Sequence, residues 1–229
     1  MIKYHFFGSE LKINRNLENR ANLSKNLEEQ GFGNSEVLFL NQIHGNEVVI
    51  IDSENKIHGV QNLPKADAMV TNLRNVNIAV ITADCMPILM FDSENKIIAA
   101  THAGWRGAKC GIIENTILAM KKLGAENISA ILGPAIQQNS YEVSKEFLEE
   151  FLLENAENKK FFKEAMAPKK YLFDLPNYVK EKLINLGIKN IKNDKIDTYQ
   201  NSEKYYSFRR STHLKEQDCG RNVSVITIN

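Results

Sequence analysis

Several features are scarce in this 229-residue sequence, and each scarcity excludes some classes of protein function. It has three cysteines, an odd number in a chain long enough to build a core without disulfides, so we expect a reducing compartment, the cytoplasm. No charge predominates, because 29 lysines and arginines stand against 28 aspartates and glutamates. This balance argues against a protein held to nucleic acid by a general basic field.

Long apolar runs are also missing. The longest extends over residues 76–91, too few to span a bilayer, and it contains Asn77 and Asp84. The first residues lack the apolar segment of a signal peptide. Apolar residues make up 43% of the chain and recur throughout it, which predicts a folded chain. We expect one domain over residues 1–229, a small-molecule substrate, and neither a membrane nor a nucleic-acid partner; the oligomeric state stays open.

Hydrophobic periodicity predicts strands and helices that mix without strict alternation. Runs of β-branched and apolar residues predict strands over 2–7, 36–40, 47–52, 68–71, 77–82, 88–92, 97–102, 128–132, 205–210 and 223–228. Helical spacing and caps predict helices over 17–30, 110–123, 144–155 and 175–186. Residues 41–46 are expected to form a tight polar turn between two strands, and residues 104–107 to break the strand pattern. The fold class is therefore α+β, with mixed sheets and helices packed on them.

Three residues of metal-ligand type fall at the ends of predicted strands: His44, Cys85 and His102. Imidazole and thiolate suit Zn²⁺ and also copper, and three protein ligands would leave one tetrahedral position open, as in catalytic zinc sites. The competing interpretation is that each histidine is satisfied by hydrogen bonds in the core or in a turn. Spacing by itself does not bring the three together.

Cys85 has two further interpretations. A buried free cysteine is most often a small hydrophobic residue. In the other interpretation, His102 activates Cys85 as the nucleophile of a Cys–His hydrolase. Its neighbour Asp84 is costly to bury without a partner, and we expect it to transfer a proton or to orient a ligand histidine.

Arginines near glycines or aromatic residues are the candidates for substrate binding. Arg106 lies between Gly104 and Gly107, shortly after His102. Glycines let the backbone approach a ligand closely, and the guanidinium could bind a phosphate or carboxylate. Near the C-terminus, Arg209, Arg210 and Arg221 could form an anion pocket beside aromatic walls. Solvated arginines at a turn and a strand end are the alternative. The substrate-binding set is Gln42, Arg106, Arg209, Arg210 and Arg221; the predicted catalytic set is Asp84, Cys85 and Arg106.

Taken together, the motifs NQIHGNEV, ADAMVTN, TADCMPILMFD, THAGWRG, LGPAI, YEVS and YYSFRR, in this order, closely resemble the YfiH-like family, also called laccase-domain or multicopper polyphenol oxidase proteins. The resemblance extends from Glu36 to the C-terminus. It implies a YfiH-like fold and one zinc ion held by His44, Cys85 and His102.

The resemblance also implies purine nucleoside chemistry: phosphorolysis of adenosine, inosine, guanosine or methylthioadenosine to the base and a ribose 1-phosphate, together with deamination of adenosine. Two alternatives within the family are an amidase that edits peptidoglycan precursors and a copper-dependent polyphenol oxidase. Five histidines are few for a multicopper oxidase, whose copper centres are largely imidazole-bound. A non-enzymatic scaffold is the remaining class.

Overall fold

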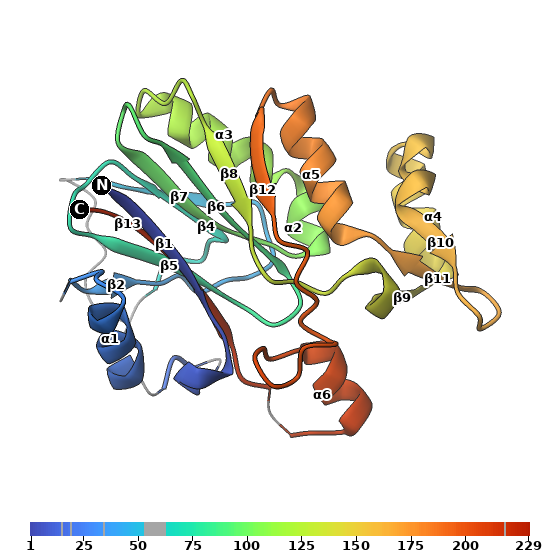
Figure 1. Ribbon diagram of the computed structural model, residues 1–229. Helices are drawn as coiled ribbons and strands as arrows, with labels where there is room; N and C mark the ends of the chain where they lie inside the picture. Colours follow the sequence, from blue (N-terminus) through green and yellow to red (C-terminus); the bar gives the residue numbers. More distant parts are fainter. Residues whose placement is uncertain (15, 19, 34, 53–62, 218) are drawn as a thin grey trace.

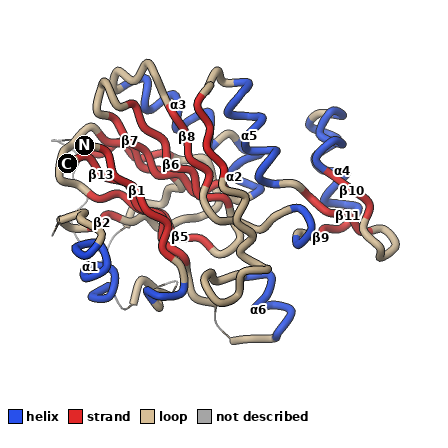
Figure 2. Tube along the Cα trace, in the orientation of Figure 1, coloured by secondary structure: helices blue, strands red, loops and turns tan. Residues whose placement is uncertain are grey.

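Two β-sheets lie face to face at the centre of the protein, and helices cover both outer sides (Figures 1 and 2). The computed structural model describes residues 1–14, 16–18, 20–33, 35–52, 63–217 and 219–229. The chain termini lie side by side, because the main-chain N–H of Asn229 donates to the carbonyl of Met1 at 2.8 Å. None of the described helices has the length and apolar character needed to cross a bilayer.

The first sheet has four strands in the order β1-β13-β5-β2. They are β1 (Ile2–Phe7), β13 (Asn222–Ile228), β5 (Asn77–Thr82) and β2 (Val37–Leu38). The second sheet has six, in the order β12-β8-β6-β7-β4-β3. They are β12 (Asn190–Asn193), β8 (Ser129–Leu132), β6 (Met86–Asp92), β7 (Ile97–Ala103), β4 (Ala68–Thr71) and β3 (Val48–Ile51). Both sheets combine parallel and antiparallel pairs, which confirms the α+β class with mixed sheets.

Strand periodicity explains how four layers form. In β7, Ile98 and Ala100 face the first sheet, whereas Ile97 and Ala99 face helices. Those helices are α3 (Ile112–Lys122) and α5 (Leu175–Asn185), which cover the outer side of the six-stranded sheet. On the other outer side, α1 (Arg20–Glu29) packs on the four-stranded sheet. Because both faces of the central strands are buried, those strands read as continuous apolar runs.

A smaller three-stranded sheet stands to one side, at the right of Figure 1. It contains β9 (Glu142–Ser144), β10 (Phe162–Glu164) and β11 (Lys170–Phe173), next to α4 (Lys145–Glu154). The short helix α2 (Trp105–Cys110) lies between it and the central sheets, and the short helix α6 (Phe208–Leu214) lies below them in the view of Figure 1. The 3₁₀ turns are η1 (Ser9–Leu11), η2 (Gln138–Ser140) and η3 (Ala156–Phe161).

One local prediction is wrong. Residues 205–210 do not form a strand, because the Ser207 hydroxyl accepts a hydrogen bond from the main-chain N–H of Arg210 and caps α6. Residues 104–107 break the strand pattern as expected, since β7 ends at Ala103 and α2 begins at Trp105. Residues 41–46 lie between two strands as expected, and these strands, β2 and β3, belong to different sheets. The other predicted strands and helices are present, with ends shifted by a few residues.

Candidate metal centre

Three side chains distant in sequence meet at one end of the stacked sheets: His44, Cys85 and His102. Their ligand atoms all lie within 4.8 Å of one another. The Cys85 Sγ and His44 Nε2 atoms are 3.8 Å apart, and the two imidazole rings meet edge to face with centroids 4.7 Å apart. Among the described residues, these three form the one cluster of histidine, cysteine and carboxylate groups arranged to hold a metal ion.

The topology explains why these residues converge. His44 lies in the segment that crosses from β2 in the first sheet to β3 in the second. Cys85 lies in the crossover from β5 to β6, also between the two sheets. His102 is near the end of β7 and pairs with Pro87 of β6, two residues after Cys85. Both crossovers and the end of β7 therefore meet at one edge.

Asp67, directly before β4, holds two of the three ligands in place. It is fully buried. Its Oδ1 atom accepts hydrogen bonds from His102 Nδ1 at 2.8 Å and from the main-chain N–H of His44 at 2.9 Å. Its Oδ2 atom accepts from the main-chain N–H groups of Gly45 and Ile43, at 2.7 and 3.2 Å. One carboxylate thus fixes the ring of His102 and the turn that carries His44.

The backbone and charge of this turn fit that role. His44 has a φ of 62°, in the left-handed region that residues other than glycine seldom adopt, and the bonds to Asp67 hold it there. Burial opposes the negative charge of Asp67, but the bonds from His102 and the main chain outweigh it and lower the pKa of the carboxyl. Asp67 is therefore an ionised acceptor at neutral pH.

Cys85 and His102 stabilise each other's charged forms. Burial opposes charge on both groups, but the neighbouring imidazoles lower the pKa of the Cys85 thiol. The thiolate and Asp67 raise the pKa of His102 against the same burial. The metal-free pair is thus a thiolate beside a protonated imidazole, and an ion that binds here displaces the His102 proton.

The donor set fits a zinc or copper ion. Ligands of a tetrahedral zinc with one sulfur and two nitrogens stand roughly 3.5 Å apart, close to the 3.8 Å between Cys85 Sγ and His44 Nε2. A Cβ atom placed on Gly104 would lie 3.0 Å from Cys85 Sγ and 3.1 Å from His44 Cδ2. Glycine at this position therefore avoids a steric clash with these two ligands. The cluster has three members, which leaves a tetrahedral ion one position for water or substrate.

Asp84 lies beside the cluster but makes its own contacts elsewhere. Its Oδ1 atom accepts from the Thr198 hydroxyl and its Oδ2 atom from the main-chain N–H of Arg209, both at 2.6 Å. Burial raises the pKa of this carboxyl in spite of these donors. The expectation that Asp84 orients a ligand histidine is wrong, because Asp67 does so for His102. Asp67 was not predicted, although it stands in the ADAMVTN motif as an acid next to a buried strand.

The predicted substrate-binding residues divide into two groups. Gln42 pairs with both main-chain groups of Ile81 at 2.8 Å, and Arg210 and Arg221 donate to main-chain carbonyls. These three side chains therefore have hydrogen-bond partners within the fold. Arg209 lines a pocket and lies 5.3 Å from the Tyr141 ring, and Arg106 lies 4.6 Å from the Trp105 ring.

Stacked mixed sheets with a histidine and cysteine cluster at their crossovers define the class: an α+β protein built around a candidate metal site. More particularly, the chain belongs to the YfiH family, since the family model described as multi-copper polyphenol oxidoreductase laccase matches residues 12–229. This confirms the resemblance found in the sequence motifs.

Named relatives and solved structures agree with this assignment. The chain is 43% identical over 185 residues to a purine nucleoside phosphorylase of Rickettsia conorii, covering 81% of this chain and 75% of that one. It is 34% identical over 192 residues to the purine nucleoside phosphorylase YfiH of Escherichia coli, covering 84% and 74%. A DUF152 protein of Neisseria meningitidis superposes with a TM-score of 0.80 at 28% identity, covering 100% and 94%. YfiH of Bacillus licheniformis shares the fold, with a TM-score of 0.84 at 21% identity, covering 100% and 93%.

Proposed function

We propose that this protein is a zinc-dependent purine nucleoside phosphorylase that also deaminates adenosine. The observation that carries the proposal is the convergence of His44, Cys85 and His102 around a position with one side left for a substrate. The names of the relatives support the substrate class, since they are called purine nucleoside phosphorylases. Adenosine, inosine, guanosine and methylthioadenosine are the proposed substrates.

Both proposed reactions balance without a redox partner. In phosphorolysis, a phosphate oxygen forms a bond to C1′ of the ribose as the C1′–N9 bond breaks. The bonding electron pair leaves with the purine, which takes up a proton, and the products are the free base and ribose 1-phosphate. In deamination, water adds at C6 of adenosine and ammonia leaves, which gives inosine.

The protein's own residues would bind and orient the reactants. A zinc ion, when bound, supplies Lewis acidity and lowers the pKa of a water molecule. Asp67 keeps His102 in the tautomer whose Nε2 atom faces the cluster. Arg106 and Arg209 are the proposed arginines for phosphate. Arg210 and Arg221 are not proposed, because their guanidinium groups donate to carbonyls of nearby main chain. Arg209 retains further N–H donors after its single bond to the Glu142 carbonyl.

We propose zinc in preference to copper. A multicopper oxidase requires several ions held largely by imidazoles. Of the five histidines, two are in the cluster, His5 is on β1, His213 is on α6, and His58 lies outside the described residues. Tightly bound copper at several atoms per chain would overturn this assignment and favour the oxidase.

Replacing His102 by alanine tests the proposal directly. The variant should lose its metal and its release of hypoxanthine from inosine with phosphate, as measured by elemental analysis and chromatography. His5→Gln is the matched control and should retain both, since His5 lies on β1 away from the cluster. Turnover that persists in metal-free His102→Ala would refute the zinc role.

One observation favours a second candidate, a Cys–His amidase acting on peptidoglycan precursors in the cytoplasm. The lowered pKa of Cys85 and its 3.8 Å approach to His44 Nε2 are typical of an activated thiolate. Incubation with a muramyl precursor that carries a wrong amino acid separates the two. Release of that amino acid, blocked by a thiol-alkylating reagent and not by a chelator, would favour the amidase.

A further inference from the structure

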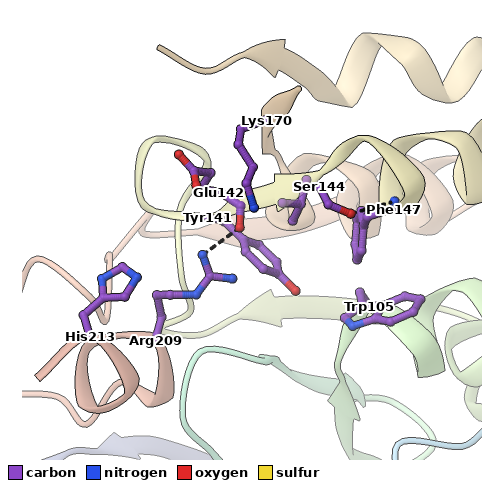
Figure 3. A pocket seen from close by; sticks show the side chains of 9 residues that line it. Trp105, Tyr141, Glu142, Ser144, Phe147, Lys170, Arg209 and His213 are labelled. Atoms are coloured by element: carbon purple, nitrogen blue, oxygen red, sulfur yellow. Dashed lines mark hydrogen bonds between the residues drawn. The ribbon is translucent and has the colours of Figure 1, made fainter. Parts of the chain in front are cut away.

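A pocket of about 430 Å³ lies between α2, α6 and the small sheet. Its lining comes from four segments far apart in the chain. These residues are Trp105, Tyr141, Glu142, Val143, Ser144, Phe147, Lys170, Arg209 and His213 (Figure 3). Of them, only Arg209 was expected to meet a substrate.

Covalent and hydrogen-bonded links connect this pocket to the metal cluster. Trp105 follows Gly104, the residue that packs against Cys85 and His44. The main-chain N–H of Arg209 is bonded to Asp84, the neighbour of Cys85. The wall of the pocket is therefore linked to the cluster through Gly104 and Asp84.

The pocket contains groups suited to an oxyanion. Arg209 and Lys170 are both cationic at neutral pH, and Figure 3 shows their side chains directed toward the chain at Tyr141 and Glu142 from opposite sides. Arg209 Nη1 donates to the Glu142 carbonyl at 2.6 Å, which fixes the guanidinium. The Glu142 carboxylate opposes an anion, but in Figure 3 it points away from the Arg209 guanidinium.

Aromatic rings complete the pocket. Trp105 and Phe147 meet edge to face with ring centroids 4.8 Å apart, and Tyr141 lies against Phe147 at 6.3 Å. Such rings offer flat apolar surface to a planar base. The pocket therefore has cationic groups at one wall and aromatic rings at another. These suit the two groups that must bind in phosphorolysis, the inorganic phosphate and the purine of the nucleoside.

We propose that this pocket binds the two substrates of phosphorolysis, with Lys170 and Arg209 holding the phosphate and Trp105 and Tyr141 facing the purine. The assignment rests on the proposed function and adds Lys170 as a determinant of phosphate binding. Inorganic phosphate and a nucleotide both present a phosphate oxyanion to Lys170.

Calorimetric titration of the metal-loaded protein with inorganic phosphate tests the site without turnover. Lys170→Met should raise the Kd for phosphate roughly tenfold, the loss of one charge-assisted hydrogen bond. It should also raise the KM for phosphate more than the KM for inosine. Glu142→Gln should lower the Kd, because it removes the opposing charge. Lys163→Met is the matched control, since Lys163 is on β10 of the same sheet and does not line the pocket.

The outcomes separate this proposal from the proposed function. An unchanged Kd in Lys170→Met would overturn the pocket assignment even if inosine is cleaved. The expected Kd shifts with no base released from any nucleoside would support an oxyanion site and refute the phosphorylase. Adenosine monophosphate that binds more tightly than phosphate, with the same dependence on Lys170, would overturn the co-substrate assignment in favour of a nucleotide.

Discussion

Asp67 accepts a hydrogen bond from His102 Nδ1 at 2.8 Å while its other contacts fix the turn of His44. Asp67→Asn retains the shape of the side chain but weakens these charge-assisted bonds. We expect the affinity for zinc to fall between about 10-fold and 100-fold, the range found for groups that orient metal ligands. Competition with a chromophoric chelator measures this without any substrate.

Asp194→Asn is the control for Asp67→Asn. Asp194 forms an exposed ion pair with Lys192 and should not change the zinc affinity. Unchanged zinc affinity in Asp67→Asn as well would show that the carboxylate does not position the ligands.

Gly104 lies against two of the three ligands, so Gly104→Ala should disturb them. The added Cβ atom would stand 3.0 Å from Cys85 Sγ and 3.1 Å from His44 Cδ2, and one of them must shift. We expect roughly a tenfold loss of zinc affinity, because ligand position controls affinity. Gly220→Ala makes a useful comparison, since its Cβ atom would meet the Tyr206 ring at 2.3 Å. It should lower the melting temperature and leave zinc binding intact.

Asp84 anchors the start of α6 and so sets the position of Arg209. Asp84→Asn should lower the free energy of unfolding by about 2 kcal/mol, because an amide cannot accept from both Thr198 and Arg209 as a carboxylate does. Urea unfolding measures this, and the metal content should stay at the wild-type level. Loss of turnover with unchanged stability and unchanged KM values would instead support proton transfer by Asp84.

Asp92, at the end of β6, stabilises the fold in a pH-dependent way. Its carboxylate accepts from the main-chain N–H groups of Glu94, Asn95, Glu126 and Asn127. Burial opposes its charge, but these donors outweigh it and hold the pKa of Asp92 well below its usual range. Since the folded pKa is depressed, the stabilisation is present above about pH 4 and is lost as the pH falls toward the folded value.

Asp92→Asn should therefore cost about 3 kcal/mol of unfolding free energy at pH 7. The difference from wild type should shrink below about pH 4, where the Asp92 carboxyl of the unfolded chain begins to take up a proton while that of the folded chain stays ionised. Urea titrations at pH 7 and pH 3 give the comparison. An equal difference at both pH values would show that the charge of Asp92 is not the stabilising feature.

Local sequence patterns determined most of the strands and helices of this protein. The turn at residues 93–96 between two apolar runs predicts the β6–β7 hairpin, and Asp174 with Pro176 predicts the start of α5; both are present. The helix α6 was missed because Tyr205, Tyr206 and Phe208 favour a strand, whereas the Ser207 cap, a single hydroxyl, starts a helix.

Only the tertiary structure decided which sheet each strand joins and what surrounds the ligands. The central strands are buried on both faces, so their sequences carry no alternation to tell β5 of one sheet from β6 of the other. The sequence predicts His44, Cys85 and His102 as metal ligands from their residue types. Their approach, the role of Asp67 and the pocket beside Lys170 depend on contacts between distant segments, which local composition does not encode.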